Sequence, residues 1–130
     1  WRGDALRARL GDARLITGSL VIATAGFLIV ALAGLLGGRA AFIGSLLGFA
    51  AVGIGTACVV PSAFAVVARR AGPGGAGAAL GRASVVSGAL RLPMPWVVGA
   101  LAASFGDAVA FGAVAALLAV GVVLSVRVLR

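Results

Sequence analysis

The chain contains no lysine, histidine, glutamate or tyrosine, and three aspartates are its only acidic residues. Without histidine or paired carboxylates, the sequence offers neither the usual general acids and bases nor a set of metal ligands. Its single cysteine, Cys58, can form no disulfide within the chain. These absences predict a protein that is not an enzyme, with no catalytic residues, no metal site and no cofactor.

Long uncharged stretches dominate what is present, since 62% of the residues are hydrophobic and only 11% are charged. A helix needs about 20 apolar residues to cross a bilayer core of about 30 Å. In lipid only helices or closed barrels satisfy the backbone, and strands of alternating polarity are absent here. The sequence therefore predicts an all-α, polytopic membrane protein with four transmembrane helices, at about 14–36, 40–69, 80–104 and 107–127.

The basic residues are all arginines, and they alternate between the two ends of the predicted helices. One side carries Arg39 alone, whereas the other carries Arg2, Arg7, Arg9, Arg14, Arg69, Arg70, Arg82, Arg127 and Arg130. By the positive-inside rule, the loops 1–13 and 70–79 and both chain ends are expected in the cytoplasm, in a multi-pass protein of the cell membrane. Because stacking aromatics do not accompany the arginines, no nucleic-acid partner is expected.

Small residues recur on one face of the second predicted helix, at Gly44, Gly48, Ala51 and Gly55. Their spacing of four, three and four places them on one side of a helix, where a neighbouring helix can approach closely. Two interpretations stay open: static packing of the bundle, or a surface that slides during a conformational change.

Arg91 is the one charge inside the third predicted helix. An arginine near the bilayer centre costs at least about 2.5 to 3.5 kcal/mol, so some interaction should offset it. Pro93 and Pro95 lack the amide hydrogens that would bond to the carbonyls of Ala89 and Arg91, which predicts a break in the helix. Arg91 either faces a central pathway, where it attracts an anionic substrate group or a distant carboxylate, or extends toward the headgroups or the free carbonyls.

The lead-in to the first predicted helix combines glycine, acidic and basic residues, at Gly3, Asp4, Arg9, Gly11 and Arg14. This pattern resembles the cytoplasmic signature loop of the major facilitator superfamily of transporters. The stretches 53–56, 60–62 and 68–72 are similar to the tenth helix of that family, and 79–84 and 95–102 are similar to the eleventh.

The resemblance implies that the chain is a fragment holding helices 9 to 12 of a twelve-helix permease. Such permeases transport a small solute by alternating access, so the implied partners are the lipid bilayer, the remaining helices and a small-molecule substrate. Asp4 would then gate the cytoplasmic face; otherwise it is an ordinary helix N-terminal charge. The alternative is a complete four-helix membrane subunit, or a small exporter that acts as an oligomer, although a proton-coupled exporter would need an acid within a helix.

Overall fold

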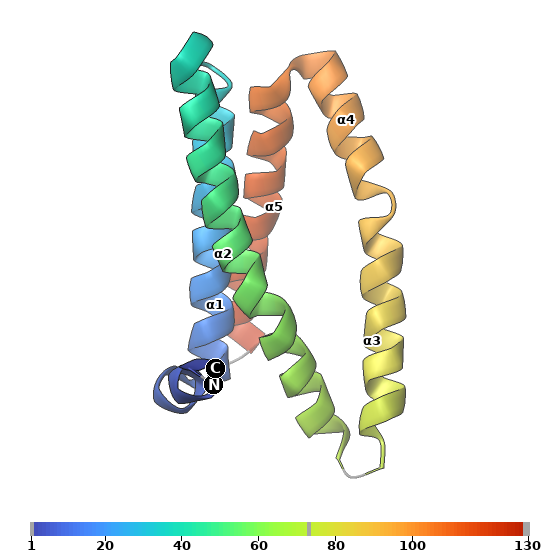
Figure 1. Cartoon of the computed structure of the whole chain (residues 1–130). Coiled ribbons are helices and arrows are strands. Elements are labelled where there is room, and N and C mark those ends of the chain that lie inside the picture. Colours follow the sequence, from blue (N-terminus) through green and yellow to red (C-terminus); the bar gives the residue numbers. More distant parts are fainter. Residues whose placement is uncertain (1, 73, 129–130) are drawn as a thin grey trace.

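The computed structural model describes residues 2–72 and 74–128, and the side chains within 14–127 apart from residue 73. Its elements are helices: α1 (Arg2–Ala33), α2 (Gly38–Ala71), α3 (Ala76–Arg91), α4 (Met94–Phe105) and α5 (Asp107–Val128) (Figure 1). In this part of the chain four segments are long and apolar enough to cross a membrane: Arg14–Ala33, Gly38–Ala71, Ala76–Phe105 and Asp107–Arg127. The prediction of an all-α protein with four candidate transmembrane helices is confirmed.

The break predicted in the third helix is present, because this span consists of two helices, α3 and α4. The span differs from its prediction in beginning earlier, at Ala76. Leu92 and Pro93 separate α3 from α4 while keeping right-handed helical backbone angles, with φ −59° and ψ −49° at Leu92. Pro93 and Pro95 each lack an amide hydrogen, so two helical hydrogen bonds cannot form here. The interruption therefore removes hydrogen bonds without turning the chain sharply.

The expected loops are also shorter in the structure. Residues 2–13, expected as a loop, belong to α1, and that helix ends at Ala33 rather than near residue 36. The loop expected at 70–79 is reduced to the glycine-rich link between Ala71 and Ala76. Gly72 and Gly74 have positive φ angles of 70° and 88°, which a residue without Cβ adopts readily, so the chain reverses within this short link.

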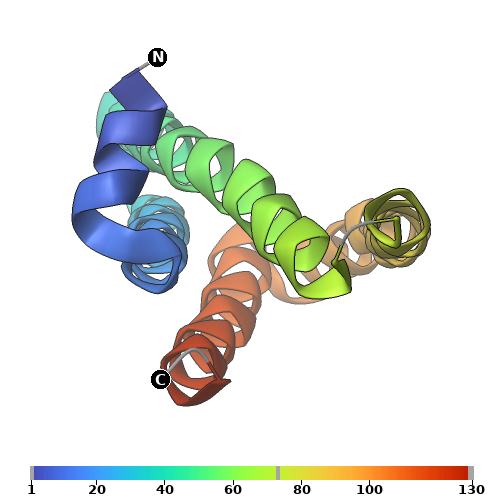
Figure 2. The same cartoon turned by 90° about the horizontal axis from the view of Figure 1, so that it is seen from below.

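Helices α1, α2 and α5 form a packed group, which we call the core, and α3 with α4 form an arm beside it (Figure 1). Among the described helices, α3 approaches only α2 and α4, and α4 approaches α5. Figure 2 shows α3 on the side of the molecule away from α1. The arm is therefore joined to the core near its two ends and stands free along much of α3.

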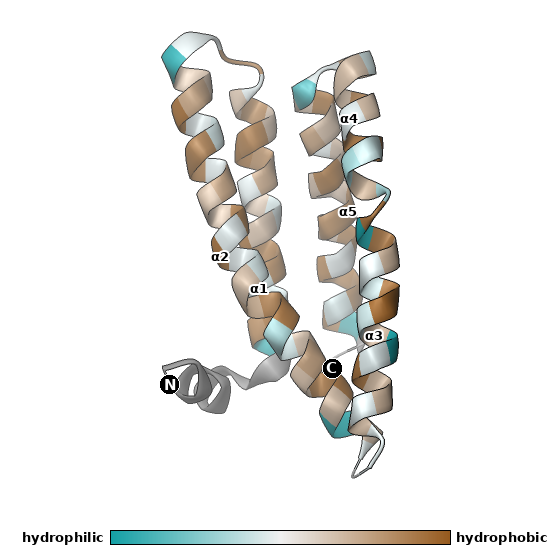
Figure 3. Ribbon diagram, turned by 45° about the vertical axis from the view of Figure 1, so that its right-hand side comes forward, coloured by the Kyte–Doolittle hydropathy of each residue, from teal (hydrophilic) through white to brown (hydrophobic). Residues whose placement is uncertain are grey.

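Burial is confined to the core. The most buried apolar residues lie on α1 and α5, and they are Ala23, Val30, Ala31, Ala33, Ala110 and Ala115. No residue of α3 or α4 is buried among the described side chains. Large apolar side chains instead face outward, such as Phe42 at 72% exposed and Trp96 at 83%, and hydrophobic colour covers the ribbon surfaces in Figure 3. An outer surface of this kind suits lipid as the surrounding solvent.

Candidate functional site

The glycine face predicted on α2 lies against α1. A Cβ atom added at Gly48 would lie 2.6 Å from Cγ2 of Val30, and one at Gly55 would lie 2.6 Å from the backbone oxygen of Ser19. At Gly44 it would lie 2.8 Å from the Cβ of Ala33. These approaches are closer than side chains tolerate, so α1 and α2 pack this tightly because the positions are glycine. Ala51, the fourth predicted position, is half-buried.

Aromatic and polar contacts join α5 to the other core helices. The ring of Phe111 stacks on Phe27 of α1 at 6.2 Å between centroids and meets Phe49 of α2 edge-on at 5.6 Å. Thr17 of α1 and Ser125 of α5 share a hydrogen bond of 3.1 Å between their hydroxyl oxygens. Because Ser125 donates its hydrogen to the Val122 carbonyl, Thr17 is the donor. Sequence analysis did not identify these contacts, since they depend on the relative rotation of separate helices.

Arg91 lies at the middle of the candidate span Ala76–Phe105, fifteen residues after its start and fourteen before its end. At a helical rise of about 1.5 Å per residue, each end is about 20 Å away along the axis. The side chain is exposed. Hydrophilic colour near the break between α3 and α4 marks the same region in Figure 3. Because α3 begins at Ala76 rather than near residue 80, Arg91 lies deeper in the span than the sequence analysis predicted.

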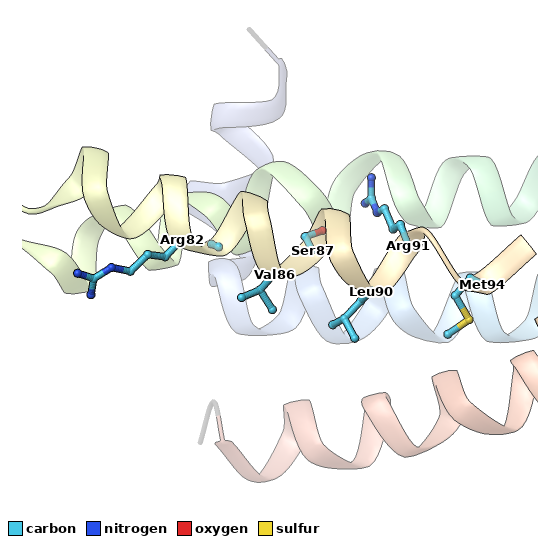
Figure 4. Close-up of a pocket in the computed structure, with 7 residues that line it drawn as sticks. Arg82, Val86, Ser87, Leu90, Arg91 and Met94 are labelled. Atoms are coloured by element: carbon cyan, nitrogen blue, oxygen red, sulfur yellow. The ribbon is translucent and has the colours of Figure 1, made fainter.

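An open hollow of about 630 Å³ runs along α3 and ends at the break, and it is lined by Arg82, Ala83, Val86, Ser87, Leu90, Arg91 and Met94. Figure 4 shows that the Arg91 side chain leaves α3 in a different direction from Leu90, while Arg82 extends along the helix toward its N-terminal end. Ser87 lies one helical turn before Arg91 and points to the same side. The two arginines therefore have different surroundings, although both line the hollow.

No carboxylate lies in either helix of the arm. Asp107 is the one acid among the described side chains, and it lies in the first turn of α5, beyond the end of α4. The described residues also contain no group of three or more histidine, cysteine or acidic residues that could hold a metal ion. The arm therefore presents positive charge, a serine hydroxyl and apolar side chains, which together suit binding of an anion rather than acid–base or metal chemistry.

Most residues of the signature-like loop are not tested by the structure. The side chains of Gly3, Asp4, Arg9 and Gly11 lie outside the described residues, so their expected gating role stays a prediction. Arg14 is exposed, at the start of the candidate span in α1.

Comparison with known proteins assigns no relative: no family model, no curated protein and no solved structure matches this chain. The resemblance to the major facilitator superfamily therefore stays a hypothesis about motifs.

Proposed function

We propose that the chain is part of a secondary transporter of the major facilitator type, which moves a small solute across the cell membrane by alternating access. The observation that carries this proposal is the position of Arg91, at the middle of a candidate span whose helix is interrupted directly after it. The lipid bilayer, a small-molecule substrate and the remaining helices of the transporter would be its partners.

A charged side chain at this depth points to an aqueous pathway. Ionisable residues within membrane spans generally face a bundle interior or a water-filled cavity, because lipid cannot solvate them. Irregular helix backbone at membrane depth must also face protein or water, because lipid cannot bond to its free polar groups. The carbonyls of Ala89 and Arg91 are such groups, since Pro93 and Pro95 have no amide hydrogen to donate to them. Transporter sites typically combine a midplane position with a discontinuous helix. The arm has both features at one point.

Orientation follows from the arginines at the helix ends. If successive spans cross the membrane in opposite directions, most arginines at the span ends lie on one side of the membrane: Arg14, Arg69, Arg70, Arg82 and Arg127. Arg39 lies on the other side. The positive-inside rule assigns the first side to the cytoplasm, so both ends of the chain would be cytoplasmic.

The proposal is tested by water access along the arm, which requires no knowledge of the substrate. Because Cys58 is exposed, the full chain first carries Cys58→Ser. Ser87→Cys then reports on the Arg91 side of α3, and Val85→Cys is the matched control, because Val85 is 72% exposed, does not line the hollow and lies two residues, or about 200° around the helix, from Ser87. A membrane-impermeant thiol reagent is applied to intact cells and to inverted vesicles.

Alternating access predicts that position 87 reacts from both sides of the membrane, while position 85 reacts from neither. If position 87 reacted in neither preparation, the pathway would be contradicted and the alternative of a small four-helix membrane subunit favoured. Equal reaction at 87 and 85 would contradict the pathway too, because α3 would then be surrounded by water rather than face it on one side.

A further inference from the structure

We propose that the hollow along α3 binds an anionic phospholipid, with the phosphate at Arg82 and an acyl chain along Val86, Leu90 and Met94. These four residues are called the α3 ridge. Ser87 and Arg91 border the same hollow, but the inference concerns the row of the α3 ridge and does not depend on transport.

Arg82, Val86 and Leu90 of the α3 ridge are spaced by four, so they form one row on the surface of α3. Met94, the first residue of α4, continues this row past the interruption. Figure 4 shows Val86, Leu90 and Met94 pointing to the same side. Their exposed fractions are 58%, 65% and 46%, so none of them is covered by another described helix. The row thus provides an apolar track along α3 that reaches the first residue of α4.

Charge complementarity selects an anionic headgroup. Arg82 lies six residues after the start of α3, about 9 Å along the axis, which is headgroup depth. Its guanidinium extends toward the helix N-terminus, on the membrane side where Arg69 and Arg70 also lie, at the end of α2. The sequences of α2, α3 and α4 contain no acidic residue. A guanidinium binds phosphate well, and nothing on these helices competes for it.

The chemistry of the α3 ridge favours a lipid chain over a protein helix. Where helices of this chain pack closely, as α1 and α2 do, the contact is made by glycine and alanine. The α3 ridge instead presents valine, leucine and methionine, whose side chains hold a neighbouring backbone at a distance. A flexible acyl chain fits between such side chains, and a phosphate at its end reaches Arg82.

Photo-crosslinking in the membrane tests this inference. The full chain carries a photo-reactive amino acid at position 90, in bilayers with equal amounts of phosphatidylglycerol and phosphatidylcholine, and mass spectrometry identifies the adducts. The matched control carries the same amino acid at position 117, because Leu117 is 61% exposed and lies near the middle of α5. We expect position 90 to capture the anionic lipid about fivefold over the zwitterionic one, and position 117 to capture both equally.

Three further variants separate the contribution of Arg82 from that of general charge. Arg82→Gln should remove the preference at position 90, whereas Arg82→Lys should retain most of it and Arg39→Gln, at the other membrane side, should leave it unchanged. Equal capture of the two lipids at position 90 would overturn the proposal. Protein adducts at position 90 would overturn it as well, because another helix or a second copy would then cover the α3 ridge.

Discussion

The core of α1, α2 and α5 and the arm of α3 and α4 are both helical and apolar, yet they are built differently. In the core, glycine and alanine bring helix backbones together and aromatic rings fill the space between them. In the arm, none of the described side chains is buried, and the helix contains an arginine and an interruption.

The difference shows that apolar composition alone does not bring helices together in a membrane. Lipid tails are as apolar as leucine, so an exposed leucine gains little by moving against another helix. Close packing of small residues does provide a gain, but only where a second helix lies against them, as α1 lies against α2. The arm also carries small residues spaced by four, three and four, at Gly77, Gly81, Ser84 and Gly88. Nothing lies within 4 Å of the Cβ positions of its glycines at 77, 81 and 88, so the surfaces of the arm are left to lipid, water or a ligand.

The largest expected effect comes from closing the space between α1 and α2. Gly48→Leu should destabilise the full chain by about 3 kcal/mol, because the new side chain meets the Val30 side chain and the backbone oxygen of Gly26, 2.7 Å from the Cβ position. The midpoint of thermal unfolding in detergent measures this. Gly53→Leu is the matched control on the same helix, since nothing lies within 4 Å of its Cβ position. Equal midpoints for the two variants would contradict glycine-mediated packing.

A smaller effect is expected from the aromatic cluster. Phe111→Ala removes both ring contacts of α5 and should cost about 1–3 kcal/mol, because each of the two aromatic pairs contributes about 0.5–1.5 kcal/mol. Phe42→Ala, at a ring that is 72% exposed, should leave the unfolding midpoint nearly unchanged. If removal of Phe42 were as damaging, the core would not be the region that holds the helices together.

Much of the fold was predictable, because the length and uniform hydrophobicity of each stretch determine how often the chain can cross a bilayer. The chemistry of proline likewise indicates an interruption near Pro93, and the structure interrupts the helix at Leu92 and Pro93. Helix ends were less predictable. Runs of alanine and glycine do not mark clearly where a helix begins or ends. The start of α3 at Ala76 and the end of α1 at Ala33 therefore differed from the predicted helix bounds.

The candidate site was predictable in part. A lone arginine in an apolar stretch is visible in any sequence, but its depth depends on where the helix begins. The side of α3 on which Arg91 lies depends on the tertiary arrangement. The α3 ridge has a regular spacing of four that could have been found in the sequence. Its exposure could not, because only the structure shows that no other described helix covers it.

The most direct test of the account asks whether α3 and α4, despite the interruption, form one membrane span with Arg91 at its centre. In the Cys58→Ser background, Gly77→Cys and Phe105→Cys mark the two ends of the arm. Position 77 has no atom within 4 Å of its Cβ position, and Phe105 is 67% exposed. The account predicts that an impermeant thiol reagent labels position 105 in intact cells and position 77 only in inverted vesicles. Labelling of both positions from the same side would contradict the single span, and with it the central depth of Arg91.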